Sequence, residues 1–187
     1  MRLNSIMVSK REQITTSAIT FLSGKPLASM EEIAKAAGIG RATLFRYFNN
    51  RQALVDELEL ECKRRLNRAI APYLSLELPA DQLLYQVIKA LIPLGDSLHF
   101  LFFEAFNINN PQVESAFQDD IKIWERLIVQ LQEEGLINSN LSHRWIARTI
   151  DSLVYQSWEM MNSENLSHAE ATQFIWRTLT QGAIRSV

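Results

Sequence analysis

Side chains that can read nucleic acid gather in one short stretch of the chain. Arginine donates hydrogen bonds to guanine edges or to phosphates, threonine can bond to either, and aromatic rings contact thymine methyl groups or phosphates. Grouped together, these residue types indicate recognition of double-stranded DNA rather than catalysis. The residues are Arg41, Thr43, Phe45, Arg46, Tyr47 and Arg51.

Two predicted helices position this stretch. Ser29 and Glu32 form an S-x-x-E capping box, which predicts a helix from Met30 to Ala37. The glycines of Gly38-Ile39-Gly40 supply the backbone freedom for a sharp turn, and a second helix is predicted over Arg41 to Phe48. Two helices joined in this way form a helix-turn-helix, whose second helix enters the major groove.

Small and apolar side chains should hold the two helices together and leave the polar face of the second helix outward. Burial of one face fixes the angle at which the helices cross. The side chains expected on the inner face are Ile33, Ala34, Ala37, Ile39, Leu44 and Phe48.

The stretch from Ala34 to Leu54 reads AKAAGIGRATLFRYFNNRQAL and resembles the DNA-binding motif of the TetR family. That motif runs roughly A-x-x-A-G-hydrophobic-S-x-G-T-hydrophobic-Y-x-[HY]-F-x-x-K-x-x-L. The match is strong over residues 9 to 55, and the remainder agrees in length, helical content and order. The resemblance implies a ligand-responsive transcriptional regulator, by family habit a repressor. The implied DNA-binding residues are Ser29, Gly40, Arg41, Ala42, Thr43, Phe45, Arg46, Tyr47 and Arg51.

Three positions depart from the family pattern. Gly40 replaces Ser or Thr, which removes a hydroxyl but remains acceptable as an N-cap. Phe45 replaces Tyr, so its ring is expected to make apolar contact with sugar or a thymine methyl, or to belong to the core. Arg51 replaces Lys and should keep a phosphate-binding role at the start of the next helix.

The rest of the chain also has helical periodicity, so we predict an all-α protein of about nine helices. A helix-turn-helix DNA-binding domain should span residues 1–55, and a ligand-binding and dimerisation domain should span residues 72–187. A fourth helix over residues 51–71 should connect the two domains. The first helix should bury Ile14, Ala18, Phe21 and Leu22, the fourth should be stopped by Pro72, and the seventh should have Gly135 as its C-cap. The other predicted helices are Ser9 to Leu22, Arg51 to Ala71, Ala80 to Ile92, Ser97 to Phe106, Pro111 to Glu134, Ser142 to Asn162, and Ser167 to Ile184.

Charge is distributed unevenly along the chain. Residues 1–68 hold 12 Lys and Arg against 7 Asp and Glu, a net +5, and the remainder holds 7 against 14, a net −7. This asymmetry is expected of a nucleic-acid-binding module attached to a regulatory body, although random surface variation alone could also produce it. Three arginines of the fourth helix are expected to be solvated or paired with Glu57 and Glu61. They are Arg64, Arg65 and Arg68.

Aromatic and polar side chains in the second body are candidate ligand contacts. Four of them recur at helical spacing over residues 99–106 and form a stripe that could be plain core, a ligand pocket or both. The pocket predicts a mostly hydrophobic small-molecule effector. The candidates are His99, Phe102, Phe103, Phe106, Trp124, Asp151, Tyr155, Trp158 and Glu159.

The last two helices are expected to pair in a homodimer. A recognition helix of seven residues spans only about 10 Å, so two copies should read a pseudo-palindromic operator. The proposed interface residues are Ile146, Ile150, Leu153 and Ser157 on one helix and Ala171, Ile175, Leu179 and Gly182 on the next.

Other classes fit the chain less well. Its histidines are scattered, and it has neither metal-ligand spacing nor a phosphate-binding glycine loop, so we expect no enzyme activity, no metal and no cofactor. A nucleoid-type DNA binder would not need the acidic, aromatic-rich body, and a pure binding module would not need the basic head. The lone Cys62, with no signal or membrane segment, predicts a cytoplasmic protein.

Overall fold

The computed structural model describes residues 9–104 and 125–182, and within these ranges the chain is helical with no strand. The all-α prediction is therefore confirmed. Residues 125–133 are also helical. The named elements are α1 (Lys10–Gly24), α2 (Met30–Ala36), α3 (Arg41–Tyr47), α4 (Arg51–Leu74), α5 (Ala80–Leu91), the 3-10 turn η1 (Ile92–Leu94), α6 (Gly95–Glu104), α8 (His143–Ser163) and α9 (His168–Gln181).

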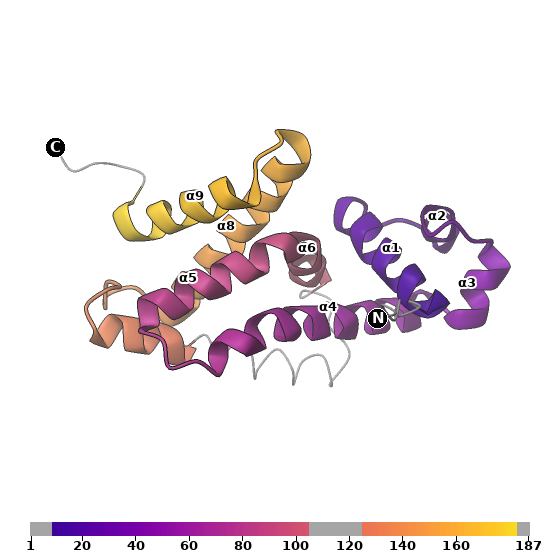
Figure 1. Ribbon diagram of the computed structural model, residues 1–187. Helices are drawn as coiled ribbons and strands as arrows, with labels where there is room; N and C mark the ends of the chain where they lie inside the picture. The colour runs from indigo at the N-terminus through magenta and orange to yellow at the C-terminus, as the bar shows by residue number, and fades with distance from the viewer. Residues whose placement is uncertain (1–8, 105–124, 183–187) are drawn as a thin grey trace, which may run out of the picture.

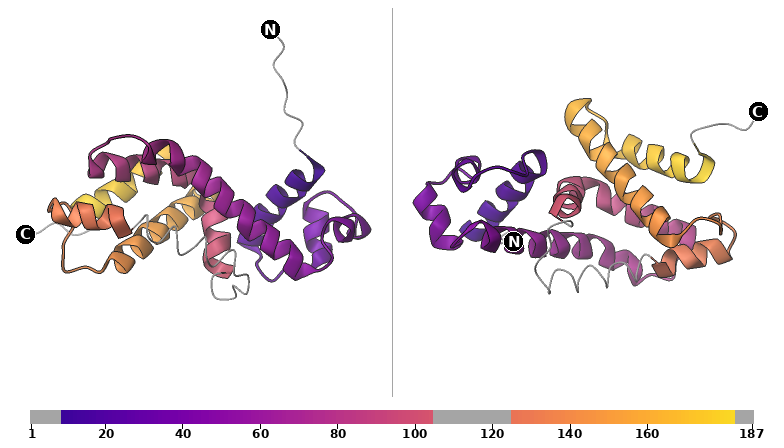
Figure 2. Two further views of the ribbon diagram at one scale, coloured as in Figure 1. Left: turned by 90° about the horizontal axis from the view of Figure 1, so that it is seen from below. Right: turned by 180° about the vertical axis from the view of Figure 1, so that it is seen from behind.

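Helices α1, α2 and α3 form a head at one end of the molecule, and α5, α8 and α9 gather toward the other end, with α6 between them beside α1 (Figure 1). The long helix α4 runs from the head along the body, so it belongs to both parts (Figure 2). Helix α1 also packs against α6. The head is thus joined to the body along α4 and through the contact between α1 and α6.

Short polar motifs begin most helices where the sequence predicts. Ser9, Ser29 and Ser167 each accept a hydrogen bond from the amide three residues on, and a glutamate returns the bond to the cap backbone. Ser142 and Asn50 also cap their helices with side-chain oxygens. These caps satisfy amides that have no partner inside the helix.

Helix α4 differs from the prediction because it continues through Pro72 to Leu74. Proline lacks an amide hydrogen, so it removes one hydrogen bond to the carbonyl four residues earlier. Pro72 lies in the last turn on an exposed side of the helix, where water can replace that bond. Proline therefore does not end this helix.

The buried face of α1 is wider than predicted. Ile14, Ala18 and Leu22 are buried as expected, whereas Phe21 is only half-buried. Thr15, Ile19 and Ser23 are buried as well. The wider face follows from the position of α1, which contacts α2 and α4 in the head and α6 in the body.

The turn between α2 and α3 is closed by backbone hydrogen bonds. Gly38 has a φ of +65°, which L side chains rarely adopt. Its amide donates to the Lys35 carbonyl at 3.1 Å, and the Ile39 amide donates to the Ala34 carbonyl at 3.0 Å. This pair of bonds is a Schellman motif, which ends α2 and directs the chain into α3.

Replacing Gly38 by alanine should destabilise the protein by about 1 to 2 kcal/mol, because a Cβ is unfavourable at positive φ. No atom lies within 4 Å of the position that this Cβ would occupy, so the cost would come from the backbone alone. Gly40→Ser is the matched control. Gly40 has a φ of −74° and no side-chain cap, so serine should be neutral or stabilising. Urea midpoints compare the variants, and equal midpoints would contradict this account of the turn.

Candidate functional site

Helix α3 has the inner and outer faces that the sequence predicts. Leu44 and Phe48 are 0% and 2% exposed and anchor the helix in the core. The other side carries the predicted DNA-binding side chains. Of these, Arg41, Ala42 and Arg46 are exposed, whereas Thr43, Phe45 and Tyr47 are half-buried.

Two arginines on this outer face lie over aromatic rings. The guanidinium of Arg41 is 5.4 Å from the centre of the Phe45 ring, and that of Arg46 is 5.7 Å from the Tyr47 ring. A cation over an aromatic face is favoured by about 0.5 to 1 kcal/mol at an exposed site. Phe45 and Tyr47 therefore support neighbouring cations besides presenting their own edges.

Two further predicted residues are engaged within the protein. Arg51 donates to the Pro26 carbonyl at 2.6 Å, which ties the start of α4 to the loop between α1 and α2. The Ser29 hydroxyl lies 2.9 Å from the Glu32 carboxylate and also accepts from the Glu32 amide. The Ser29 amide also donates to the Glu32 carboxylate at 2.8 Å, and this bond, with that of the Ser29 hydroxyl, lowers the pKa of Glu32. Both residues thus have structural roles in addition to any contact with DNA.

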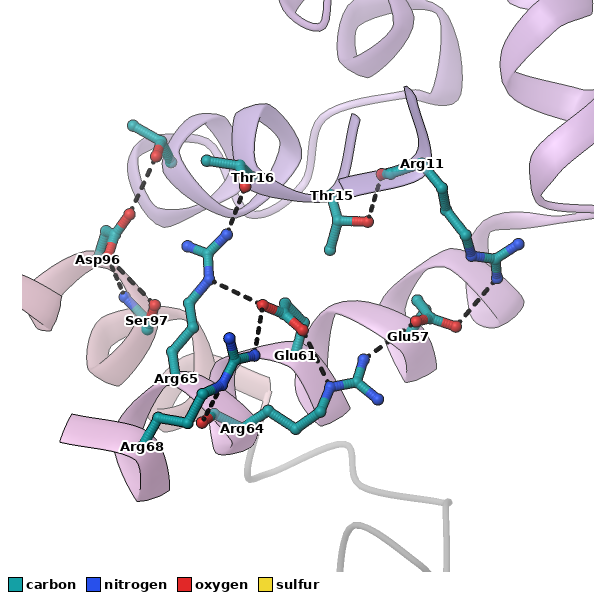
Figure 3. Close-up of polar contacts among 11 residues, drawn as sticks. Arg11, Thr15, Thr16, Glu57, Glu61, Arg64, Arg65, Arg68, Asp96 and Ser97 are labelled. Carbon is teal, nitrogen blue, oxygen red and sulfur yellow. Dashed lines mark hydrogen bonds and ion pairs between the residues drawn. The ribbon is translucent and has the colours of Figure 1, made fainter. Parts of the chain in front are cut away.

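The arginines of α4 are paired with carboxylates, as the sequence suggests (Figure 3). Arg64 bridges Glu57 and Glu61 at 3.2 and 3.0 Å. Arg65 and Arg68 approach Glu61 at 3.3 and 3.4 Å. The two carboxylates offset only part of the charge of the three arginines, and Arg64 and Arg68 remain exposed cations in addition to those of α3.

The sequence did not reveal Arg11 as part of this network. Arg11 pairs with Glu57 at 3.0 Å and lies 4.8 Å from the centre of the Phe48 ring. Burial opposes the ionised form of Glu57, but Arg11 and Arg64 together lower its pKa. Arg11 therefore connects α1 to α3 and α4, a contact between residues too distant in sequence for a local pattern to show.

Three of the candidate ligand contacts meet between α6 and α8. His99 stacks on Tyr155 with ring centres 4.2 Å apart and planes at 16°. Trp158 lies 5.9 Å from His99 and 6.1 Å from Tyr155. We call His99, Tyr155 and Trp158 the aromatic cluster. Burial lowers the pKa of His99, with Glu159 opposing, which favours the neutral imidazole.

A carboxylate lies one helical turn before the aromatic cluster. Asp151 shares a face of α8 with Tyr155, and burial raises its pKa to about 6, with Arg148 opposing. Glu159, by contrast, is exposed at the edge. Phe102 and Phe103 lie on α6, but their side chains, like Phe106 and Trp124, are outside the described residues.

The predicted dimer residues are mostly on the wrong face. Ile146, Ile150, Ser157, Ala171 and Ile175 are buried inside a single chain, at most 6% exposed. The apolar periodicity of α8 and α9 therefore marks their packing against the body. A partner would have to contact the opposite sides of these helices.

The described residues contain no group of three or more His, Cys, Asp or Glu side chains that could hold a metal ion. Within the same ranges, no helix is both long and apolar enough to cross a membrane. A surface hollow of about 520 Å³ is lined by residues including Glu125, Glu133 and His143, and none of its lining residues is a candidate contact.

The comparisons with known proteins agree with this geometry. Residues 22–58, which contain the helix-turn-helix, match the family of bacterial regulatory proteins called tetR. The HTH-type transcriptional repressor LfrR of Mycolicibacterium smegmatis is 26% identical over 93% of this chain and 90% of its own length. The HTH-type transcriptional regulator MT1294 of Mycobacterium tuberculosis is 42% identical over 67% of this chain and 63% of its own.

The helix-turn-helix head of this chain is of the TetR family. The chain is thus a helix-turn-helix transcriptional regulator and not an enzyme. Solved TetR-like structures share its fold. LfrR in complex with proflavine has a TM-score of 0.75 at 24% identity, over 95% of this chain and 97% of LfrR. AibR with isovaleryl coenzyme A and operator DNA has a TM-score of 0.75 at 14% identity, over 92% and 98%.

The single cysteine of this chain lies in the core. Cys62 is fully buried on α4, and burial raises the pKa of its thiol to about 12, with the Ser97 hydroxyl opposing. The reactive species is the thiolate, so burial suppresses both its formation and its access to reagents.

Native protein should therefore react with a thiol reagent such as DTNB at least about 100-fold more slowly than protein unfolded in urea. The measurement is the labelling rate at pH 8. A surface cysteine introduced at Lys35, which is exposed, serves as the reactive control. Fast labelling of Cys62 in the folded wild type would contradict its burial.

Proposed function

We propose that this regulator represses transcription by binding a pseudo-palindromic operator as a homodimer, and that a planar aromatic cation releases it. The observation that carries the DNA-binding part is the division of α3 into a buried side and an exposed cationic side. The division holds Arg41 and Arg46 outward on a helix anchored by Leu44 and Phe48. A major-groove reader needs this arrangement.

The proposed contacts to DNA divide into base reading and backbone positioning. Arg41 and Arg46 are exposed and can reach base edges, with Thr43 between them on the same helix. Ala42 is small and exposed, so it permits close approach. The amide of Gly40 and the remaining donors of Arg51 lie near helix N-termini, where phosphates are favoured.

The proposed homodimer uses the outward sides of α8 and α9. Trp145 on α8 is 65% exposed and Phe174 on α9 is 49% exposed. Large aromatic side chains in such positions are typical of the anchors in protein interfaces. Two copies would bring two recognition helices to one operator, which a single seven-residue helix needs for specificity.

The proposed effector is an aromatic cation because of what surrounds the aromatic cluster. Flat rings of His99, Tyr155 and Trp158 offer stacking surfaces, and Asp151 offers a carboxylate on the same face of α8. The relative LfrR was solved with proflavine, itself a planar aromatic molecule. Bound cation would compensate the unfavourable burial of the Asp151 carboxylate.

Release from DNA would then be a shift in population. An effector that binds better to one arrangement of the heads moves the dimer toward that arrangement. If the two recognition helices in that arrangement are spaced differently from the half-sites of the operator, the affinity of the dimer for DNA falls. The coupling free energy between effector binding and DNA binding can be modest, since couplings of about 1 to 3 kcal/mol change affinity about 5- to 150-fold.

Arg46→Ala should weaken operator binding by about 10- to 100-fold and leave dimerisation intact, because it removes base or phosphate contacts in both half-sites. Arg64→Ala is the matched control, since Arg64 is an exposed arginine paired with Glu57 and Glu61. Gel shifts on DNA selected from a random pool by the wild type measure affinity, and sedimentation measures the dimer. Equal losses in the two variants would reject α3 as the reading element.

Ethidium, a planar cation whose charge does not change with pH, should bind about tenfold more weakly at pH 5.0 than at pH 7.5. Protonation of Asp151 below its pKa of about 6 removes the carboxylate that attracts the cation. Asp151→Asn should bind weakly and show little of this pH dependence, which separates Asp151 from His99 and Glu159. Fluorescence titration without DNA measures both proteins. The same pH profile in wild type and variant would remove Asp151 from the site.

A further inference from the structure

Three consecutive residues at the start of α6 contact three different helices. Gly95 packs on Trp158 of α8, Asp96 accepts a hydrogen bond from Thr20 of α1, and Ser97 meets Cys62 of α4. We call Gly95, Asp96 and Ser97 the α6 joint. Gly95 and Ser97 are buried, so the contacts of the α6 joint with α8 and with α4 lie inside the protein.

The contact with α8 leaves no space at Gly95. A Cβ on this residue would lie 2.2 Å from the Cβ of Trp158, far inside van der Waals contact. Trp158 also belongs to the aromatic cluster, and His99 lies one turn beyond Gly95 on α6. A displacement of the Trp158 ring therefore presses directly on the start of α6.

The contact with α1 reaches the DNA-binding head. The Thr20 hydroxyl donates to Asp96 Oδ2 at 3.0 Å. Asp96 Oδ1 accepts from the Ser97 amide at 2.6 Å (Figure 3). The second bond holds the carboxylate in place, so its orientation follows that of α6. One turn earlier on α1, Thr16 accepts from Arg65 of α4.

The head therefore has two kinds of polar attachment. Arg11 and Thr16 bind it to α4, whose first turns carry the head in any case. Thr20 binds it to α6, a helix of the body. Thr20 is therefore a polar tie through which a movement of α6 can reach α1, alongside the packing between these two helices.

We propose that Asp96 is a positioning residue for DNA recognition. Its hydrogen bond from Thr20 sets the orientation of the head. Because Gly95 packs on Trp158, a shift of the aromatic cluster moves the start of α6 and Asp96 with it. The proposal rests on the proposed function for its DNA and effector sides. The hydrogen bond between Thr20 and Asp96 is exposed, so the packing of the core does not require it. The proposal gives this bond a function.

The first test measures the head directly and needs no DNA. Spin labels at Lys35→Cys on α2 and Gln173→Cys on α9, both exposed, report the distance between head and body. Thr20→Val and Asp96→Ala should each broaden or shift the distance distribution. Thr16→Val, which removes a threonine contact one turn away, should leave it unchanged. Unchanged distributions in the first two variants, or an equal change in all three, would overturn the proposal.

The second test uses DNA selected by the wild type and the same DNA with two base pairs inserted between half-sites. Thr20→Val and Asp96→Ala should each reduce discrimination between the two DNAs by about two- to tenfold, as expected for loss of one hydrogen bond. The double variant should resemble Asp96→Ala alone, because Thr20→Val removes only a bond that Asp96→Ala already removes. Additive losses would contradict action through that bond.

Gly95→Ala tests the link to the aromatic cluster. Its Cβ should push α6 away from Trp158, shift the spin-label distance and lower discrimination, with little further effect in a Thr20→Val background. Additive effects would show that the path does not pass through Thr20, and this would overturn the link. If Gly95→Ala does not fold, as judged by circular dichroism, Trp158→Phe replaces it. This change removes bulk and loosens the same contact, so it too should alter the spin-label distance and lower discrimination, with little further effect in a Thr20→Val background.

A wild type that selects no DNA would contradict the proposed function, and the spin-label distances would still decide the role of Asp96. A wild type that discriminates normally, with Thr20→Val and Asp96→Ala indistinguishable from it, would contradict the role of Asp96 and leave the proposed function standing. The two failures are therefore separate.

Discussion

The structure depends on one shared element, the buried face of α1. This helix packs in the head against α2 and α4 and in the body against α6. Its apolar side chains cannot leave one neighbour for water without cost, since burying a side chain of this size stabilises by about 1.5 to 3 kcal/mol. The head is consequently held against the body by the same face that gives it a core. Any change in the position of α6 acts on a helix that also supports α3.

Local features of the protein were predictable from sequence, and long-range ones were not. Ser29 with Glu32 marked the start of α2, the glycine turn marked its end, and Leu44 and Phe48 were correctly assigned to the core. Each depends on residues a few positions apart. The bond from Thr20 to Asp96 joins residues 76 positions apart, and no local pattern encodes it.

Two errors show where a local sequence pattern misleads. The periodic faces of α8 and α9 were assigned to a dimer, yet Ile150 and Ile175 are buried within one chain. Periodicity reveals that a face is buried but not what covers it. Pro72 was expected to end α4, yet a proline in an exposed last turn costs a single hydrogen bond, which water can supply. Both errors concern the surroundings of a residue rather than its type.

The close crossing of α6 and α8 at Gly95 has a consequence for the evolution of this protein. Tryptophan fits at position 158 because position 95 has no side chain, so the two residues depend on each other sterically. A lineage that acquires a larger residue at 95 must lose bulk at 158 or separate the helices. Substitutions at the two positions should therefore be correlated among descendants of this chain, and each position limits which changes the other can accept.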